Sequence, residues 1–157
     1  HYYIALAYLD LKNEDEAIRE LERAVGSKYV IPEMYLKLGS IHTAKGNLAE
    51  AEQLYQKAVA LDPARPEAHL RLAEVYRLRG AHDRALEQLK RAAPDGKRFL
   101  NTEYFQKLQA DYFYETGRVY EDKGMVEEAA KAYMRALEVE PGHEPAQRQL
   151  AALRKRQ

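Results

Sequence analysis

The chain has no cysteine and no tryptophan among its 157 residues. Without cysteine it has no disulfide, no thiolate nucleophile and no cysteine-ligated metal site. This absence suits the cytosol and the periplasm alike, so it leaves the compartment unknown. No apolar run approaches the roughly 20 residues that a membrane-spanning helix needs, and no segment resembles a secretion signal. We therefore expect no membrane insertion.

Net charge is absent as well, because 25 Lys and Arg residues balance 25 Asp and Glu residues. A nucleic-acid binder that works through bulk charge is therefore not expected. Enzyme signatures are also missing: the sequence has no HExxH, no P-loop, no GxGxxG and no GxSxG motif. Adjacent acids such as Glu127 and Glu128 open helices, where carboxylates suit the helix dipole. We expect no enzyme, no cofactor and no metal.

What the chain does contain is a helical composition and a repeat. "GNLAEAEQLYQKAVALDP", from Gly46, returns as "GMVEEAAKAYMRALEVEP", from Gly124. A small residue, a large one four positions later and an alanine three positions after that form one helix face. The small residues are Ala17, Ala51, Ala85 and Ala129, in steps of 34, 34 and 44 residues; the large ones are Leu21, Tyr55, Leu89 and Tyr133.

A second helix is predicted just upstream of each of these copies. In it a small residue such as Gly39 or Gly117 is followed three positions later by a ring, His42 or Tyr120. Tight turns follow at Gly46, Gly80 and Gly124, with Lys12 at this place in the first copy, and Pro63 and Pro141 end the later helix. Each unit is therefore predicted to be helix, turn, helix and loop, in an all-α fold.

This 34-residue pattern resembles the tetratricopeptide repeat. In residues 32–65 the family's positions are filled by Tyr35, Leu38, Gly39, His42, Ala51, Tyr55, Ala58 and Pro63. The resemblance extends over 1–31, which lacks the start of its first helix, over 66–99, which lacks the closing proline, and over 110–143. It implies a right-handed superhelical solenoid of stacked antiparallel helix pairs, with the first helices lining the concave side. A lone helix pair cannot bury its apolar face, which explains why the chain repeats it.

Three segments depart from the repeat. Residues 100–109 are an insertion, and a helix is expected from Asn101 or Thr102 to Lys123. Its Tyr104, Phe105 and Leu108 either pack on residues 94–100, against Phe99 and Leu100, or form an exposed aromatic surface. Residues 144–157 are expected to be a capping helix. At the other end, a row of apolar residues in the first helix has nothing upstream to cover it, so we expect further repeats or a docked partner there: Tyr2, Tyr3, Ile4, Leu6 and Leu9.

The family resemblance also implies where a ligand binds, namely on first-helix positions of the concave face. Carried over by position, these are Tyr2, Leu6, Leu36, Lys37, Ser40, Leu70, Arg71, Glu74, Arg77, Tyr114 and Arg118, together with Leu9, Thr43, Glu115 and Glu121. Tyr2 and Leu6 stand where the family's chaperone-binding clamp has Lys and Asn, so a chaperone C-terminus is not expected. Lys37 and Arg71 occupy equivalent places and predict an acidic group or a C-terminal carboxylate in the ligand. Alternatively, the charges pair within the stack, with Glu74 neutralising Arg71 or Arg77.

These observations favour a non-catalytic scaffold or adaptor, whose partner is a protein segment or peptide held in the concave groove. Two alternatives remain. One is a self-assembling scaffold that oligomerises through its repeat ends, the N-terminal face above all. The other is a regulatory segment of a larger enzyme.

Overall fold

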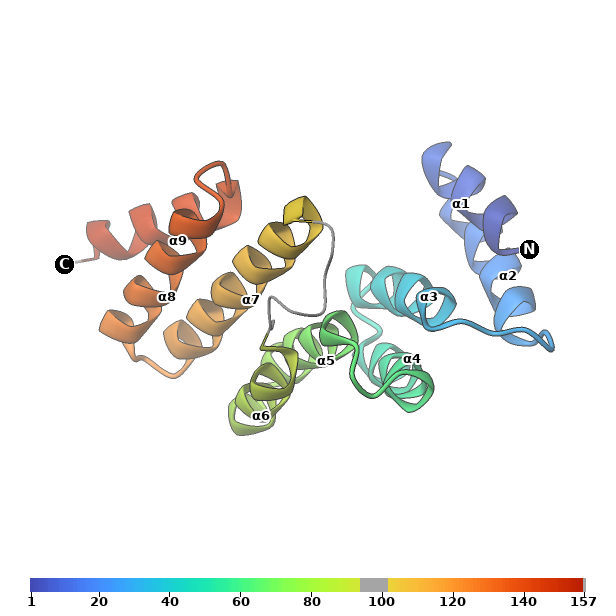
Figure 1. The fold of residues 1–157 in the computed structure, drawn as a ribbon, viewed down its shortest axis with the longest axis horizontal. Helices are drawn as coiled ribbons and strands as arrows, with labels where there is room; N and C mark the ends of the chain where they lie inside the picture. The colour runs from blue at the N-terminus through green and yellow to red at the C-terminus, as the bar shows by residue number, and fades with distance from the viewer. Residues whose placement is uncertain (94–101, 157) are drawn as a thin grey trace. The chain divides into compact units, whose positions relative to one another are not determined.

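The computed structural model describes residues 1–93 and 102–156, and every regular element within them is an α-helix (Figure 1). The all-α prediction is therefore confirmed. The helices are α1 Tyr2–Asp10, α2 Glu14–Val25, α3 Pro32–Ala44, α4 Leu48–Leu61, α5 Pro66–Leu78, α6 His82–Ala92, α7 Thr102–Asp122, α8 Val126–Val139 and α9 Glu144–Lys155.

The helices fall into two compact units, His1–Val75 and Tyr76–Gln157. In the first unit α1 packs on α2, α2 on α3 and α3 on α4. In the second unit α6 packs on α7, α7 on α8 and α8 on α9. The boundary falls near the end of α5, whose last three residues belong to the second unit. Within each unit, packing between consecutive helices is what a chain of helix pairs requires.

The tight turns inside the helix pairs share one geometry. Gly46, Gly80 and Gly124 have positive φ angles of 78°, 74° and 75°. Lys12, at the equivalent place in the first repeat, also has a positive φ, of 58°. In each turn the next residue donates its backbone N–H across the end of the helix, as Asn47 does to the carbonyl of His42 at 2.9 Å. This left-handed helix ending favours glycine, which has no Cβ to clash.

The two helices of a pair approach most closely at a glycine. A Cβ on Gly39 would lie 2.6 Å from the ring of Tyr55, and one on Gly117 would lie 2.5 Å from the ring of Tyr133. Both rings are fully buried. The alanines beside them, such as Ala51 and Ala129, are fully buried too, so small residues line the contact as the sequence predicts.

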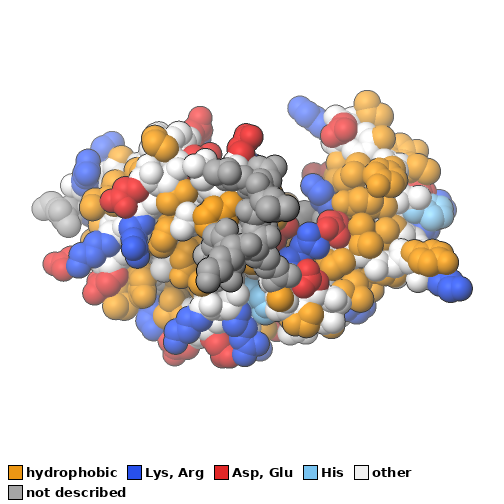
Figure 2. Space-filling view, viewed as in Figure 1, with side chains coloured by type: hydrophobic (Ala, Val, Ile, Leu, Met, Phe, Trp, Pro, Cys, Tyr) orange, Lys and Arg blue, Asp and Glu red, His pale blue; other side chains and the backbone are white. Residues whose placement is uncertain are grey.

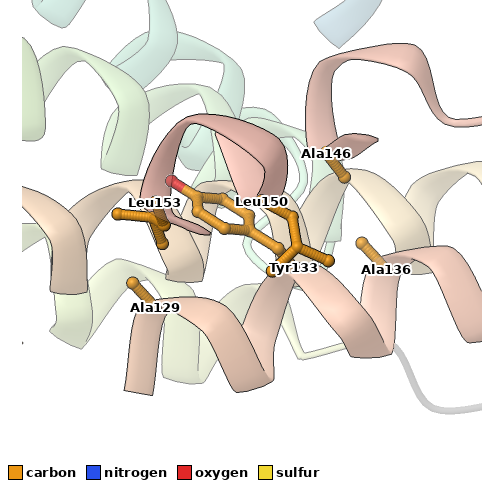
Figure 3. Packing of buried hydrophobic residues seen from close by; sticks show 6 residues of the cluster. All are labelled: Ala129, Tyr133, Ala136, Ala146, Leu150 and Leu153. Carbon is orange, nitrogen blue, oxygen red and sulfur yellow. The ribbon is translucent and has the colours of Figure 1, made fainter. Parts of the chain in front are cut away.

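The expected C-terminal helix is α9, and it packs on α8 (Figure 3). Its Leu150 and Leu153 share a buried cluster with Tyr133. Its N-cap is His143, whose Nδ1 accepts the backbone N–H of Ala146 at 3.1 Å. The other ring nitrogen, Nε2, lies 3.0 Å from the carboxylate of Asp111 on α7. A buried histidine thus fixes the start of α9 to the neighbouring helix.

The long helix α7 ends at Asp122, one residue before the expected Lys123. Leu108 is buried, Phe105 is half-buried and Tyr104 is 40 % exposed. Phe99 and Leu100, the partners expected for these side chains, lie outside the described residues.

Candidate binding pocket

A cavity of about 130 Å³ opens in the first unit between α1, α3 and α5. An apolar cavity of about 150 Å³ holds a benzene molecule, so this space suits one side chain or terminal group of a ligand. We call it the α1–α3–α5 pocket. It is lined by Tyr2, Glu33, Leu36, Lys37, Ser40, Glu67 and Arg71.

Helix register explains why these residues meet. Proline is the first residue of both α3 and α5, where its fixed φ suits a helix start. The two helices therefore begin 34 residues apart, and equivalent positions such as Lys37 and Arg71 face the same space. Five residues predicted from the sequence line this pocket: Tyr2, Leu36, Lys37, Ser40 and Arg71. Leu36 is buried and supplies an apolar wall.

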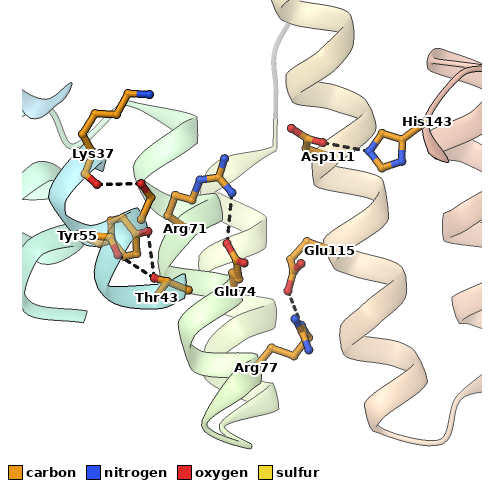
Figure 4. A network of polar contacts seen from close by, with 11 residues as sticks. Lys37, Thr43, Tyr55, Arg71, Glu74, Arg77, Asp111, Glu115 and His143 are labelled. Atoms are coloured by element: carbon orange, nitrogen blue, oxygen red, sulfur yellow. Dashed lines mark hydrogen bonds and ion pairs between the residues drawn. The ribbon is translucent and has the colours of Figure 1, made fainter. Parts of the chain in front are cut away.

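Two cations line the pocket, and they differ in their partners. Lys37 is exposed, and its Nζ makes no ion pair within residues 1–93 and 102–156. Its backbone carbonyl accepts from Ser40 Oγ at 2.8 Å, and in Figure 4 the dashed line at Lys37 reaches this carbonyl and not Nζ. Arg71 donates from Nη1 to Glu74 at 3.2 Å. Burial lowers the pKa of the Arg71 guanidinium, but attraction by Glu74 and other neighbours outweighs burial, so the net direction is upward and the charge is kept.

Two carboxylates of the pocket, Glu33 and Glu67, were not among the predicted site residues. Glu33 bonds Arg65 at 2.6 Å, and 39 % of its side chain remains exposed. Glu33 precedes Lys37 by four residues, and Glu67 precedes Arg71 by four. This repeated spacing was the signal that could have revealed them, because residues four apart share a helix face.

Tyr2 brings an aromatic ring from α1 to the same space and is half-buried. Burial raises the pKa of its phenol, and the charges of Glu33 and Glu67 raise it further. The hydroxyl therefore stays protonated at neutral pH and can donate a hydrogen bond to a ligand.

The structure places the remaining predicted residues outside this pocket. Arg77 is buried and bonds Glu115 at 2.5 Å (Figure 4). It also bonds Asp122 at 3.3 Å. Leu70 is buried, Leu6 is half-buried, and Glu74 holds Arg71. In the second unit Arg118 donates to the hydroxyl of Tyr114 at 3.1 Å, and the Tyr114 ring lies against His143. The alternative of pairing within the stack thus describes Arg77 and, through Glu74, Arg71, whereas Lys37 makes no ion pair with any described residue.

A second hollow, of about 290 Å³, lies in the second unit where α6 begins. Its charged groups are engaged with each other or with an aromatic ring. Lys123 bonds Asp83 at 2.8 Å, and Arg84 stacks on the ring of Tyr76. Because both cations of this second hollow are engaged and no large apolar side chain among the described residues lines it, we regard the α1–α3–α5 pocket as the better candidate site.

Large apolar side chains are exposed on α1 and just after it. Tyr3 is 83 % exposed, Ile4 51 % and Leu11 75 %. The space-filling view shows hydrophobic side chains gathered over the first unit (Figure 2). Exposed apolar side chains that gather in one region are typical of an interaction surface.

The described residues contain no group of three or more His, Cys, Asp and Glu side chains arranged to hold a metal ion. Among the same residues, no helix combines the length and the apolar character needed to cross a bilayer.

Several solved structures share this fold. The crystal structure of MamA has 26 % identity and a TM-score of 0.72, over 97 % of this chain and 83 % of that one. The structure of YrrB, described as a tetratricopeptide repeat protein with an unusual peptide-binding site, has 24 % identity and a TM-score of 0.72, over 94 % of this chain and 72 % of that one. The first tetratricopeptide repeat domain of Spaghetti (RPAP3), bound to an HSP90 peptide, has 21 % identity and a TM-score of 0.63, over 79 % of this chain and 90 % of that one.

A comparison with curated protein sequences gives no significant match. Three family models match the chain, and each describes the tetratricopeptide repeat. They cover residues 2–66, 42–112 and 110–143, and so together reach almost from end to end. The helix pairs, the glycine turns and the small-to-large contacts agree with these matches. The chain belongs to the tetratricopeptide repeat family.

Proposed function

We propose that this protein is a non-catalytic interaction scaffold that holds a segment of a partner protein in the α1–α3–α5 pocket. The observation that carries the proposal is that three groups meet around one small cavity: the Lys37 ammonium, which has no ion pair among the described residues, the Arg71 guanidinium and the buried Leu36. Peptide binding by proteins of the same fold supports it: YrrB has a peptide-binding site, and the RPAP3 domain was solved with a peptide.

The ligand group that would bind Lys37 and Arg71 is an acidic side chain or a C-terminal carboxylate. Lys37 can offer its ammonium without first breaking an ion pair to any residue that the structure describes. Arg71 has one described side-chain hydrogen bond, through Nη1, so the other N–H groups of its planar guanidinium can donate to a carboxylate. Leu36 would pack against the apolar part of the same side chain.

The test begins by selecting ligands from a library of random peptides of about twelve residues, displayed on phage, on the immobilised protein. Such peptides span about 40 Å when extended, well beyond one pocket. The selected peptides are then measured against Arg71→Glu, with Arg148→Glu, an exposed arginine of α9, as the matched control.

We expect Arg71→Glu to weaken binding at least about tenfold, a loss of about 1.4 kcal/mol, and Arg148→Glu to leave it unchanged. Wild-type binding should also weaken as salt rises, because exposed charges are screened. Melting curves must show that both variants remain folded. Equal affinity of the wild type and Arg71→Glu would place the ligand elsewhere.

A second candidate is self-assembly, favoured by the exposed apolar side chains Tyr3, Ile4 and Leu11. Copies would join through this face of α1, which would be covered in the assembly.

A further inference from the structure

The α1–α3–α5 pocket carries two rows of opposite charge. The acidic row is Glu33 and Glu67, and the basic row is Lys37 and Arg71. Each acid precedes its cation by four residues on one helix, and the two helices repeat the arrangement 34 residues later. The pocket is therefore bipolar, although the proposed acidic ligand uses only one of its rows.

Helix geometry sets the spacing of the rows. Four residues of α-helix rise about 6 Å, and neighbouring packed helices lie about 8–10 Å apart. An extended peptide points successive side chains to opposite sides, with about 6.8 Å between side chains on the same side. A segment lying between the rows would present one side to the acids and the other side to the cations.

We propose that the preferred ligand is an extended segment with opposite charges at neighbouring positions: a Lys or Arg side chain facing Glu33 and Glu67, and a carboxylate facing Lys37 and Arg71. This inference rests on the proposed function, since it adds the cationic half of the ligand that the acidic row recognises.

Repulsion gives this pocket its selectivity. A wholly acidic segment brings its carboxylates close to Glu33 and Glu67, and a wholly basic one brings its cations close to Lys37 and Arg71. A segment with both signs meets attraction from both rows. Specificity thus comes from what the pocket rejects as well as from what it binds.

Existing partners do not exhaust the acidic row, because a carboxylate has two oxygens with about four acceptor sites. Arg65 contacts Oε1 of Glu33 at 2.6 Å, and both Glu33 and Glu67 keep acceptor capacity beyond one partner each. Tyr2 lines the same pocket as both acids, and an aromatic ring can attract a cation in addition to an ion pair.

The experiment repeats the peptide selection with the double variant Glu33→Gln/Glu67→Gln. Its matched control is Glu127→Gln/Glu128→Gln, which removes two exposed carboxylates from the start of α8. From the wild type and the control we expect peptides with a Lys or Arg within about two residues of an Asp or Glu. The pocket variant should still select acidic residues, but without the neighbouring cation.

The strongest wild-type peptide is then synthesised with its cation replaced by Gln. We expect the replacement to weaken binding to the wild type about tenfold and to have little effect on the pocket variant. If the pocket variant melts at a lower temperature than the wild type, the single change Glu67→Gln takes its place.

The outcomes separate the two proposals. Acidic peptides without a cation, lost with Arg71→Glu, would support the scaffold function and overturn the bipolar pocket. An equal effect of the cation on wild type and pocket variant would also overturn it. Both proposals would be overturned if the selected peptides bound Arg71→Glu as tightly as the wild type. They would also be overturned if no peptide were enriched on the protein relative to an uncoated surface.

Discussion

Gly39 and Gly117 each face a buried tyrosine ring at a distance that leaves no room for a methyl group. Three small-and-large pairs of this kind lie within the two units, each with its members sixteen residues apart. Glycine goes with tyrosine in Gly39–Tyr55 and Gly117–Tyr133, and alanine goes with leucine in Ala5–Leu21, which share a buried cluster. Where the small residue is larger, the large residue is smaller, so the summed volume of the two side chains stays nearly the same. A change at one position therefore alters the effect of a change at the other.

This coupling predicts a double-mutant cycle. Gly39→Ala should lower the free energy of unfolding by about 1–3 kcal/mol, because the new Cβ would lie 2.6 Å from Tyr55 Cε1. Gly39→Ala with Tyr55→Leu recreates the alanine–leucine pair and should cost less than the sum of the single changes. Urea unfolding measures all three. Gly142→Ala, where a Cβ would meet nothing within 4 Å, is the control. Additive losses would mean that the ring and the methyl do not compete.

The buried phenols predict a loss of stability at high pH. Burial raises the pKa of Tyr55 to about 12, whereas an unfolded tyrosine ionises near 10. Below pH 10 both states keep the proton and stability is complete. Between about pH 10 and 12 only the unfolded state ionises, so the free energy of unfolding should fall, by on the order of 2 kcal/mol for this residue.

Urea unfolding at several alkaline pH values measures this slope. Tyr55→Phe should flatten it, while Tyr29→Phe, which alters a tyrosine 79 % exposed, should leave it unchanged. Equal slopes in all three proteins would show that Tyr55 ionises as freely in the fold as in the unfolded chain.

Part of the pocket lining was predicted, through the family resemblance. Five of the seven lining residues are among the positions that the resemblance implies: Tyr2, Leu36, Lys37, Ser40 and Arg71. The resemblance did not identify Glu33 and Glu67, which read as ordinary first-turn acids of α3 and α5. Nor could it tell Arg71 from Arg77, since the partners of Arg77 on α7 lie 38 and 45 residues away in the sequence.

At the scale of the element, the turn after α1 has lysine where the turns of the later helix pairs have glycine. Lys12 adopts the positive φ that Gly46, Gly80 and Gly124 adopt at the same place. A side chain in the left-handed region costs about 1 kcal/mol or more. Lys12→Gly should therefore raise the free energy of unfolding, by up to about 1 kcal/mol after the greater entropy of unfolded glycine is counted.

Chemical denaturation measures that gain. Lys45→Gly is the control, because Lys45 ends α3 with an ordinary right-handed φ of −79° and should lose stability on the same change. A loss in Lys12→Gly as large as in Lys45→Gly would mean that the turn stores no strain.

The elements themselves were largely predictable, for local reasons. Proline, the turn glycines and the spacing of small and large residues act within one helix pair, and they place the starts of α3 and α5 and the turns that follow. The start of α9 was predicted as well, since a helix was expected over residues 144–157 and α9 begins at Glu144. What the local sequence did not indicate is how its cap is held: His143 contacts Asp111, 32 residues earlier.

At the scale of the whole molecule, the apolar face of α1 predicts self-association. We expect the average mass, measured by light scattering, to rise with protein concentration, because Tyr3, Ile4 and Leu11 lose exposed apolar area on contact. Ile4→Glu with Tyr3→Glu should hold the mass at that of one chain, and Tyr29→Glu should not. A wild-type mass independent of concentration would exclude assembly through this face.

The glycine–tyrosine contacts also limit how such a gene can be rearranged. Recombination that exchanges whole helix pairs moves each small residue together with its large partner. A crossover inside a pair can join the helix of Ala5 to the helix of Tyr55, which sets a methyl group against a ring, or the helix of Gly39 to that of Leu21, which leaves a void. Viable breakpoints should therefore lie in the loops between repeats rather than in the glycine turns within them.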